Sequence, residues 1–218
     1  TSMYKLLSQY LSQADMNDNI HSIILTGTND CFTSGNDLKD FLAAGALDAD
    51  HPTVQFLYLL AQCPKPLVAA VSGLAIGIGT TALLHCDLVY AADTACFQLP
   101  FTQLGLCPEA ASSLLLPRLV GYQRAAQYLL LGERFDAAQA HAMGLVNQVV
   151  THAELEALAW QKAQQLAALP ADAVQTSKTL LKAGSREVTA TIAAELAQFQ
   201  RLLDGDDCQQ RIAAFFKR

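Results

Sequence analysis

A glycine-rich turn and a lone glutamate are the residues of this sequence whose types and spacing best suit chemistry. The turn carries Gly73, Gly77 and Gly79, and the run 80–85 that follows it predicts the first turns of a helix. A helix entered through glycines presents unpaired N–H groups and the positive end of its dipole, which stabilise negative charge on a bound oxygen. A carboxylate such as Glu109, placed beside that oxygen, can remove a proton next to a carbonyl while the N–H groups hold the enolate.

The residues around Glu109 favour a strong base. Pro108 predicts that Glu109 lies near the N-terminus of a helix, because proline suits the first helical turn. Leu104, Leu106 and the pair 110–111 predict an apolar wall, and desolvation by such a wall raises the pKa of a carboxyl group. A glutamate that only stabilises the helix dipole, by less than about 1 kcal/mol, is the structural alternative.

A second candidate for ligand binding is the polar loop that begins at Thr28. It follows a predicted strand over residues 22–26, and ligands commonly bind at the carboxyl ends of strands in α/β sheets. An ordinary strand-to-helix connection would have a similar composition. Asn36 or Asp37 is predicted to cap the short helix that follows.

The elements that must position these residues alternate between strands and helices. Buried strands are predicted over residues 22–26, 67–71, 87–91 and 145–150, and helices over 2–14, from Pro52, over 122–131 and over 137–143. From Thr151, where Glu154 completes a capping box, the pattern is helix after helix with breaks near Pro170, Gly184 and Gly205. We therefore predict an α/β core over residues 1–150 and a helical region of the same domain over residues 151–218.

Composition excludes several classes of protein. The chain has 218 residues, 52% hydrophobic and 16% charged, which predicts a compact domain or an oligomer. A net charge of −6 without a basic stripe argues against nucleic-acid binding. The uncharged run 67–84 approaches the length of a membrane span, but its glycine, serine and threonine residues favour strand, turn and helix, so no membrane partner is expected.

Spacing excludes other sites. The six cysteines form no C-x-x-C pair and have no histidine at zinc-ligand spacing, so we expect reduced thiols, no metal site and a cytoplasmic location. Gly77 and Gly79 form G-x-G, but alanine stands at position 82 where a dinucleotide-binding turn has its third glycine.

Four segments together resemble the crotonase family, also called the enoyl-CoA hydratase/isomerase superfamily: residues 32–38, 64–73, 86–91 and 144–147. The resemblance runs in order from about residue 3 to the carboxyl terminus. It implies an α/β fold with a spiral ββα core and a carboxy-terminal helical region. The family assembles as trimers or pairs of trimers, so residues 151–218 are expected to serve oligomerisation. The family's first strands are absent here, and we expect the chain to be trimmed or disordered at its amino terminus.

The resemblance also implies a site for an acyl-CoA substrate. Its oxyanion hole would be the backbone N–H groups of Ser34 and Ile78, with the thioester carbonyl between them. Coenzyme A would be part of the substrate, so no separate cofactor is expected. The residues implied in substrate binding are Ser34, Gly35, Asn36, Asp37, Leu38, Gly77 and Gly79.

The carboxylates indicate which member of the family the chain is most similar to. Hydratases of the family use two glutamates, whose positions are here Thr81 and Phe101. Residues 98–102 and 104–113 instead resemble the peroxisomal type of Δ3,Δ2-enoyl-CoA isomerase, which has a single base in a Pro-Glu pair. That base would be Glu109, moving the double bond of 3-enoyl-CoA to 2-enoyl-CoA in fatty acid oxidation.

Two alternatives stay open. One is an enoyl-CoA hydratase-like enzyme that uses another base, such as Asp37 or His85, although Asp37 suits a helix cap and His85 a buried core position. The other is a non-catalytic crotonase homologue that binds acyl-CoA without changing it, because a fold alone does not fix a function.

Overall fold

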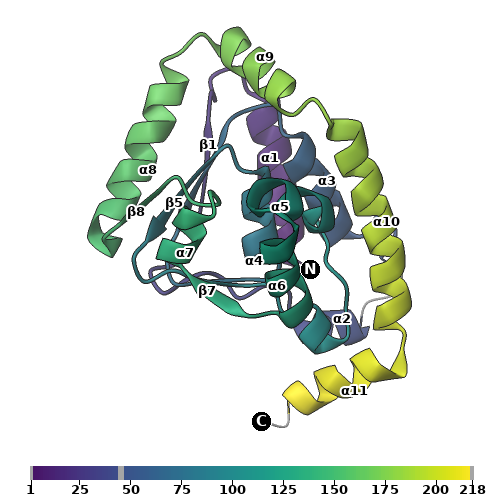
Figure 1. The fold of residues 1–218 in the computed structure, drawn as a ribbon. Coiled ribbons are helices and arrows are strands. Elements are labelled where there is room, and N and C mark those ends of the chain that lie inside the picture. The colour runs from purple at the N-terminus through teal and green to yellow at the C-terminus, as the bar shows by residue number, and fades with distance from the viewer. Residues whose placement is uncertain (1, 44–46, 217–218) are drawn as a thin grey trace.

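Two four-stranded sheets form the centre of the molecule (Figure 1). The computed structural model describes residues 2–43 and 47–216. The first sheet has the order β1 (Ile23–Thr26), β3 (Leu67–Val71), β5 (Leu88–Ala92) and β8 (Gln148–Val150), with all neighbours parallel. The second has the order β2 (Cys31–Thr33), β4 (Leu74–Ile76), β6 (Cys96–Gln98) and β7 (Arg134–Asp136), of which only the β6–β7 pair is antiparallel.

The chain passes repeatedly from the first sheet into the second and then into a helix. β1 leads to β2 and α2 (Leu38–Ala43), and β3 leads to β4 and α4 (Ile78–Thr81), which a 3-10 turn extends through His85. β5 leads to β6 and a 3-10 turn over Thr102–Leu104. This repeat is the ββα spiral, so the predicted fold class is confirmed.

Gly73 makes the turn between β3 and β4 possible. Its φ is +63°, and a Cβ placed there would lie 1.8 Å from the Asp30 carbonyl oxygen. No other residue fits so close to the backbone of the preceding turn of the spiral. The consequence is that β4 starts beside β2, where the candidate ligand loop begins.

Helices surround the two sheets. They are α1 (Ser2–Met16), α3 (Pro52–Gln62), α5 (Ser112–Val120), α6 (Tyr122–Leu131), α7 (Ala137–Ala142), α8 (His152–Ala167), α9 (Ala171–Leu181), α10 (Ser185–Leu203) and α11 (Asp206–Phe215). In Figure 1, α8 lies at one side of the molecule, where it packs against β3 and β5, and α10 runs along the other side, where it packs against α3 and α5. The four carboxy-terminal helices α8–α11 thus wrap around the core.

Sequence periodicity predicted the longer elements well. The strand over residues 67–71 and the helix over residues 122–131 have the predicted bounds, and the helices after Thr151 break near Pro170, Gly184 and Gly205 as expected. The capping box predicted at Thr151 forms, because the Glu154 side chain accepts from the Thr151 N–H. Asp136 caps α7 in the same way, since its side chain accepts from the Gln139 N–H.

Other predicted bounds were wrong. The polar loop from Thr28 contains β2, and the glycine turn contains β4, because strands of three residues are too short to show an alternating pattern. The strand predicted over residues 145–150 begins only at Gln148. Leu145 and Val146 are buried beneath the end of α7 instead, where the Val146 N–H donates to the Ala140 carbonyl.

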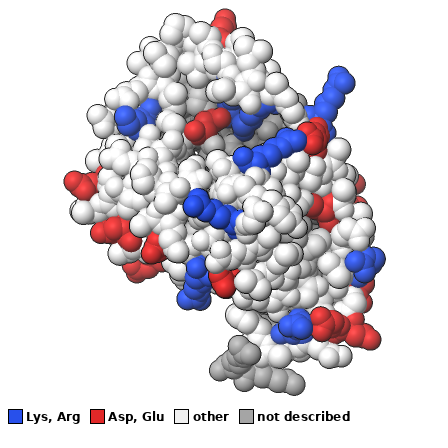
Figure 2. Space-filling model, in the orientation of Figure 1, with Lys and Arg blue, Asp and Glu red and all other residues white. Residues whose placement is uncertain are grey.

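Charged side chains are mixed on the surface that Figure 2 shows, where Lys and Arg alternate with Asp and Glu. Among the described residues, no helix combines the length and the apolar character that crossing a membrane requires. The six cysteines are free thiols, as expected.

Two buried lysines connect the helices to the first sheet. The Lys65 ammonium donates to the carbonyls of Ala14 and Asn17 at 2.5 and 2.7 Å, at the end of α1. The Lys178 ammonium, on α9, donates to the Lys65 carbonyl at 2.7 Å and to Asp87 Oδ2 at 2.6 Å. Asp87 stands immediately before β5, so α9 is attached to the core through a charge pair with little solvent exposure.

Replacing Lys178 with methionine should lower the free energy of unfolding by about 3 kcal/mol, because Asp87 would keep a largely buried charge without its cation. Arg118→Met is the matched control, since Arg118 pairs with Glu187 where both side chains are about half exposed, and such a pair contributes under about 1 kcal/mol. Urea unfolding of both variants measures the difference. Equal losses would contradict a structural role for the Lys178–Asp87 pair.

Candidate active site

Glu109 lies in a turn that precedes α5. Glu109 lies near a helix N-terminus, as predicted, but Pro108 is not in the first turn of that helix, because Ala110 and Ala111 adopt left-handed φ values of 58° and 55° and α5 begins only at Ser112. The Ser112 side chain donates to the Glu109 carbonyl at 2.6 Å and closes the turn. Glu109 is therefore held before the N-terminus of α5, on a backbone that few alanines adopt.

The Glu109 carboxyl group is buried, with 4% of the residue exposed. Its Oε1 accepts a hydrogen bond of 2.5 Å from the Thr81 hydroxyl, and within the described part of the chain its Oε2 has no partner. Burial raises the pKa of Glu109 to about 8; the Thr81 hydrogen bond opposes the rise, and the negative charge of Glu195 adds to it. A carboxyl group with one oxygen fixed and the other unpaired is suited to accept and return a proton.

Thr81 comes from α4, the helix that follows the glycine turn. Gly77 precedes this helix and donates its N–H to the Gln98 carbonyl at 2.9 Å. A Cβ on Gly79 would lie 2.6 Å from the Thr33 side chain, so the helix start presses against the end of β2. Ile78, between these glycines, is buried in the same apolar cluster as Ala110. The helix N-terminus and the glutamate turn are thus neighbours, as the sequence analysis predicted.

The loop that begins at Ser34 lies next to the helix start. Ser34 follows β2 directly and is exposed, and β2 pairs with β4, which leads to Gly77. Gly35 turns the chain with a φ of +90° and donates its N–H to the Thr33 hydroxyl at 3.1 Å. A Cβ on Gly35 would lie 2.9 Å from the Ile76 carbonyl oxygen, so the loop and the end of β4 are in close contact.

Three residues considered in the sequence analysis have other contacts. Asp37 Oδ1 accepts from the Lys39 N–H at 2.9 Å at the start of α2, as expected of a helix cap, and Leu38 packs against the main core. His85 is buried, and its Nε2 lies 2.7 Å from the Ala110 carbonyl. Burial lowers the pKa of His85 to about 4, so the neutral ring donates to that carbonyl and supports the glutamate turn. The side chains of Asp37 and His85 are therefore not positioned to act as a second base.

Two residues near Glu109 were missed in the sequence analysis. Glu195, on α10, is 7% exposed and accepts hydrogen bonds from the Ala111 N–H at 2.6 Å and the Ser113 N–H at 2.9 Å. Tyr4, on α1, is buried, and among the described residues its hydroxyl has no hydrogen-bond partner. Burial, together with the charge of Glu109, raises the pKa of Tyr4. Nothing local in the sequence marks either residue, since both reach the site only through packing of distant helices.

These features, a ββα spiral with a buried glutamate beside a glycine-bounded helix start, agree with the comparison with known families. The family Enoyl-CoA hydratase/isomerase matches residues 1–218, and the chain belongs to this family. The family resemblance in the sequence is therefore confirmed.

The names of individual relatives state different enzymatic activities. The chain is 34% identical to the rat (Rattus norvegicus) protein enoyl-CoA delta isomerase 2, over 99% of the chain and 57% of that protein. It is 33% identical to 1,2-epoxyphenylacetyl-CoA isomerase of Escherichia coli, over 99% of the chain and 86% of that protein. The solved structure of Pseudomonas aeruginosa OdaA superposes with a TM-score of 0.97 at 40% identity, covering 100% of the chain and 89% of that structure. The chain spans little more than half the length of the delta isomerase.

Ionisation of Glu109 should weaken the fold as pH rises. The unfolded chain releases this proton near pH 4.5, whereas the folded protein keeps it up to about pH 8. Between these values the folded state binds more protons than the unfolded state, so stability falls with rising pH, by up to roughly 5 kcal/mol for this one group. Glu109→Gln, which cannot ionise, should be spared this loss.

Urea unfolding at pH 5 and pH 9 tests this expectation. The stability of the Glu109→Gln variant relative to the unmodified protein should increase between the two pH values. Glu187→Gln, which removes an exposed carboxylate from α10, is the control and should leave the pH dependence nearly unchanged. The same pH dependence in the Glu109→Gln variant and the unmodified protein would contradict the raised pKa.

Proposed function

We propose that the protein is a Δ3,Δ2-enoyl-CoA isomerase that moves the double bond of a 3-enoyl-CoA to form a 2-enoyl-CoA. The observation that carries the proposal is the Glu109 carboxyl group, which is buried, fixed by Thr81 through one oxygen and unpaired at the other. The resemblance of residues 98–102 and 104–113 to the peroxisomal type of isomerase points to the same residue.

In the proposed reaction, Glu109 Oε2 takes a proton from C2 of the substrate. The electrons of that C–H bond form a double bond between C1 and C2, and the π electrons of the thioester carbonyl move to its oxygen, which gives a dienolate. The same carboxyl group then returns the proton to C4, where the C3–C4 π electrons form the new C–H bond. The C1–C2 π electrons shift to become the C2–C3 double bond, and the oxygen's electron pair restores the thioester carbonyl. Because the proton leaves and returns on one face, a single carboxylate suffices.

The dienolate oxygen requires hydrogen-bond donors. We assign this role to the backbone N–H of Ile78, at the start of α4, and to that of Ser34, in the adjacent loop. The two positions follow the neighbouring strands β4 and β2, which supports their pairing around one oxygen. Loss of one such donor typically costs about 3–4 kcal/mol in the barrier. Residues 34–38 with Gly77 and Gly79 would line the path of the acyl-CoA substrate.

Hydration of an enoyl-CoA is the second candidate function. Adding water is favoured by two groups, one to activate water and another to deliver a proton. The two hydratase positions hold Thr81, which donates to Glu109, and Phe101, which is buried in the main core. Both oxygens of another nearby carboxylate, Glu195, accept hydrogen bonds from Ala111 and Ser113. Among these groups of the described residues, Glu109 is the one with a carboxyl oxygen left without a partner, which favours isomerisation.

The proposal extends to assembly and location. Exposed apolar side chains occur on the carboxy-terminal helices, with Leu180 70% and Leu181 87% exposed on α9 and Trp160 55% exposed on α8. Such side chains support assembly into a homotrimer or a dimer of trimers, in which residues 151–218 would bury them. A cytoplasmic location and service in fatty acid oxidation are parts of the same proposal.

Glu109→Gln should reduce isomerase turnover by roughly 10²–10⁴-fold while acyl-CoA binding persists, because the amide cannot accept the C2 proton. Purified protein is incubated separately with 3-hexenoyl-CoA and with 2-hexenoyl-CoA. Formation of the conjugated enoyl thioester is followed by ultraviolet absorption, and the products are identified by mass spectrometry. Glu187→Gln serves as the matched control and should retain full turnover.

Three other outcomes would count against the proposal. Addition of water to 2-hexenoyl-CoA would make the protein a hydratase. Binding without conversion of either ester would support a non-catalytic homologue. Near-normal turnover in Glu109→Gln would remove Glu109 from the role of base.

The rate of isomerisation should depend on pH in a defined direction. Since the base must be ionised and the pKa of Glu109 is about 8, kcat/KM should rise about tenfold per pH unit below pH 8 and level off above it. Initial rates with 3-hexenoyl-CoA between pH 5.5 and 9.5, at substrate concentrations well below KM, measure this dependence of kcat/KM on pH. A rate that does not change with pH over this range would contradict a base with a raised pKa, and so the proposed state of Glu109.

A further inference from the structure

A carboxylate on the carboxy-terminal helix α10 holds the turn that carries Glu109. Glu195 Oε2 accepts from the Ala111 N–H at 2.6 Å, and Glu195 Oε1 accepts from the Ser113 N–H at 2.9 Å and the Ser113 hydroxyl at 2.5 Å. All three partners are donors, which is the pattern that an ionised carboxylate requires. Glu195 thus spans the start of α5 from a helix more than eighty positions away in the sequence.

The turn needs such support because it is strained. Two successive alanines, Ala110 and Ala111, take left-handed φ values, which are unfavourable for residues with a Cβ. A conformation of this kind persists only where surrounding contacts fix it. His85 holds the Ala110 carbonyl and Glu195 holds the Ala111 N–H, so the turn is bound from both sides. The direction of the Glu109 side chain depends on this backbone.

Glu195 is also the charged group that faces Glu109. The other titratable groups around the turn are Tyr4 on α1, whose pKa is raised, Cys107 in the same loop, with a pKa of about 11, and His85, with a pKa of about 4. These three are neutral near pH 7. The negative charge of Glu195 therefore acts on Glu109 without an opposing cation among these groups, and it makes the release of the Glu109 proton harder.

We propose that Glu195 is a positioning residue, which fixes the left-handed turn and thereby the orientation of the Glu109 base. This inference rests on the proposed function of Glu109. It adds that the carboxy-terminal helix α10 belongs to the catalytic apparatus, and that the charge of Glu195 helps to set the pH at which the base ionises. Removing the charge should therefore change both the rate and its pH dependence, in separable ways.

Glu195→Gln is the principal test, because it keeps the shape and removes the charge. The amide group cannot accept from both Ala111 and Ser113, so the turn loses at least one bond. We expect kcat with 3-hexenoyl-CoA to fall on the order of tenfold to a hundredfold, as misplaced catalytic groups typically show. The pH at which the rate levels off should move to a lower value, because a neighbouring like charge is gone. Glu187→Gln, on the same helix, is the matched control and should change neither.

A readout independent of turnover separates this inference from the proposed function. Infrared difference spectra, with Glu109→Gln used to assign the carboxyl band, measure the pKa of Glu109 directly. A lower pKa in Glu195→Gln supports the inference even if the protein does not isomerise 3-hexenoyl-CoA, in which case only the proposed reaction fails. An unchanged pKa and pH profile, with thermal stability alone reduced, would overturn the inference and leave Glu195 a purely structural residue.

Ser113→Ala serves if Glu195→Gln does not fold. This variant removes the hydroxyl that donates to Glu195 Oε1 and keeps the charge. We expect kcat to fall several-fold while the pKa of Glu109 stays close to its original value, because only the positioning is weakened. Unchanged kcat in Ser113→Ala would overturn the positioning role.

Discussion

The carboxyl group of Glu109 is kept away from water, and the surrounding structure depends on accommodating it. Burial of an ionisable group with one unpaired oxygen is unfavourable unless neighbours compensate. Thr81 supplies one hydrogen bond, and the left-handed turn at Ala110 and Ala111 is closed by contacts from His85 and other helices. The same burial raises the pKa of the carboxyl group to about 8. Burial of Glu109 thus lowers the stability of the fold and at the same time makes the carboxylate a stronger base. Such a perturbed pKa is a common feature of catalytic sites.

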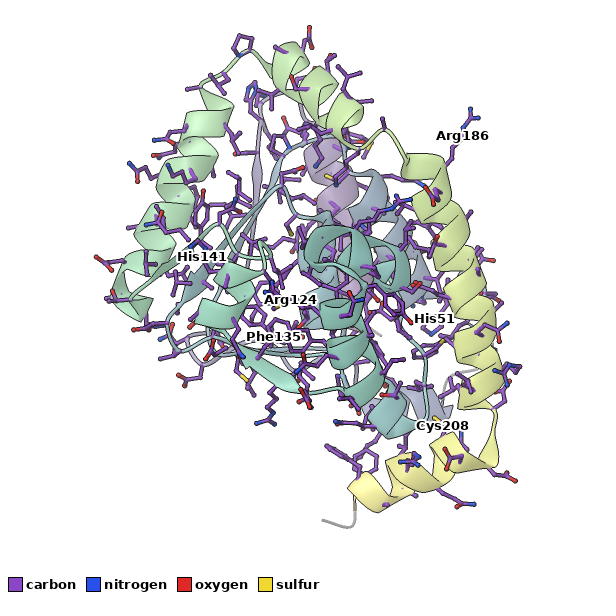
Figure 3. All side chains as sticks on the ribbon, in the orientation of Figure 1. His51, Arg124, Phe135, His141, Arg186 and Cys208 are labelled. Carbon is purple, nitrogen blue, oxygen red and sulfur yellow. The ribbon has the colours of Figure 1, made fainter. Side chains whose placement is uncertain are left out.

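The spiral brings the parts of the site together through strand pairing. β2 and β4 are each three residues long, yet their pairing places the loop at Ser34 beside the helix start at Ile78. The carboxy-terminal helices then complete the site, since α10 provides Glu195 and α11 packs Cys208, labelled in Figure 3, against Gly105 in the loop before Glu109. The helical region is therefore packed into the site rather than appended to it. Exchange of a few carboxylates on such a scaffold is enough to alter the chemistry.

Much of the fold could be predicted from the sequence, but less of the site. The buried strand β3 and the helix α6 have the predicted bounds, because each carries its own hydrophobic pattern. Glu109 was recognised as buried from its apolar neighbours, and its proximity to the helix after the glycine turn was also expected. The start of α5 was misplaced, because nothing in two alanines signals left-handed backbone. The roles of Ser34 and Ile78 as donors, and the trimer, stay predictions.

By itself the sequence determined the class of fold and the family, and it singled out Glu109 as the candidate base, since these depend on residue types and on local spacing. It also determined the helix ends at Pro170, Gly184 and Gly205, where the backbone preferences of proline and glycine act locally. Only the tertiary structure decided which groups surround Glu109. The Ala111–Glu195 hydrogen bond joins residues 84 positions apart. Contacts of that kind leave no periodic pattern along the chain, because they arise only when separate helices pack against the same turn.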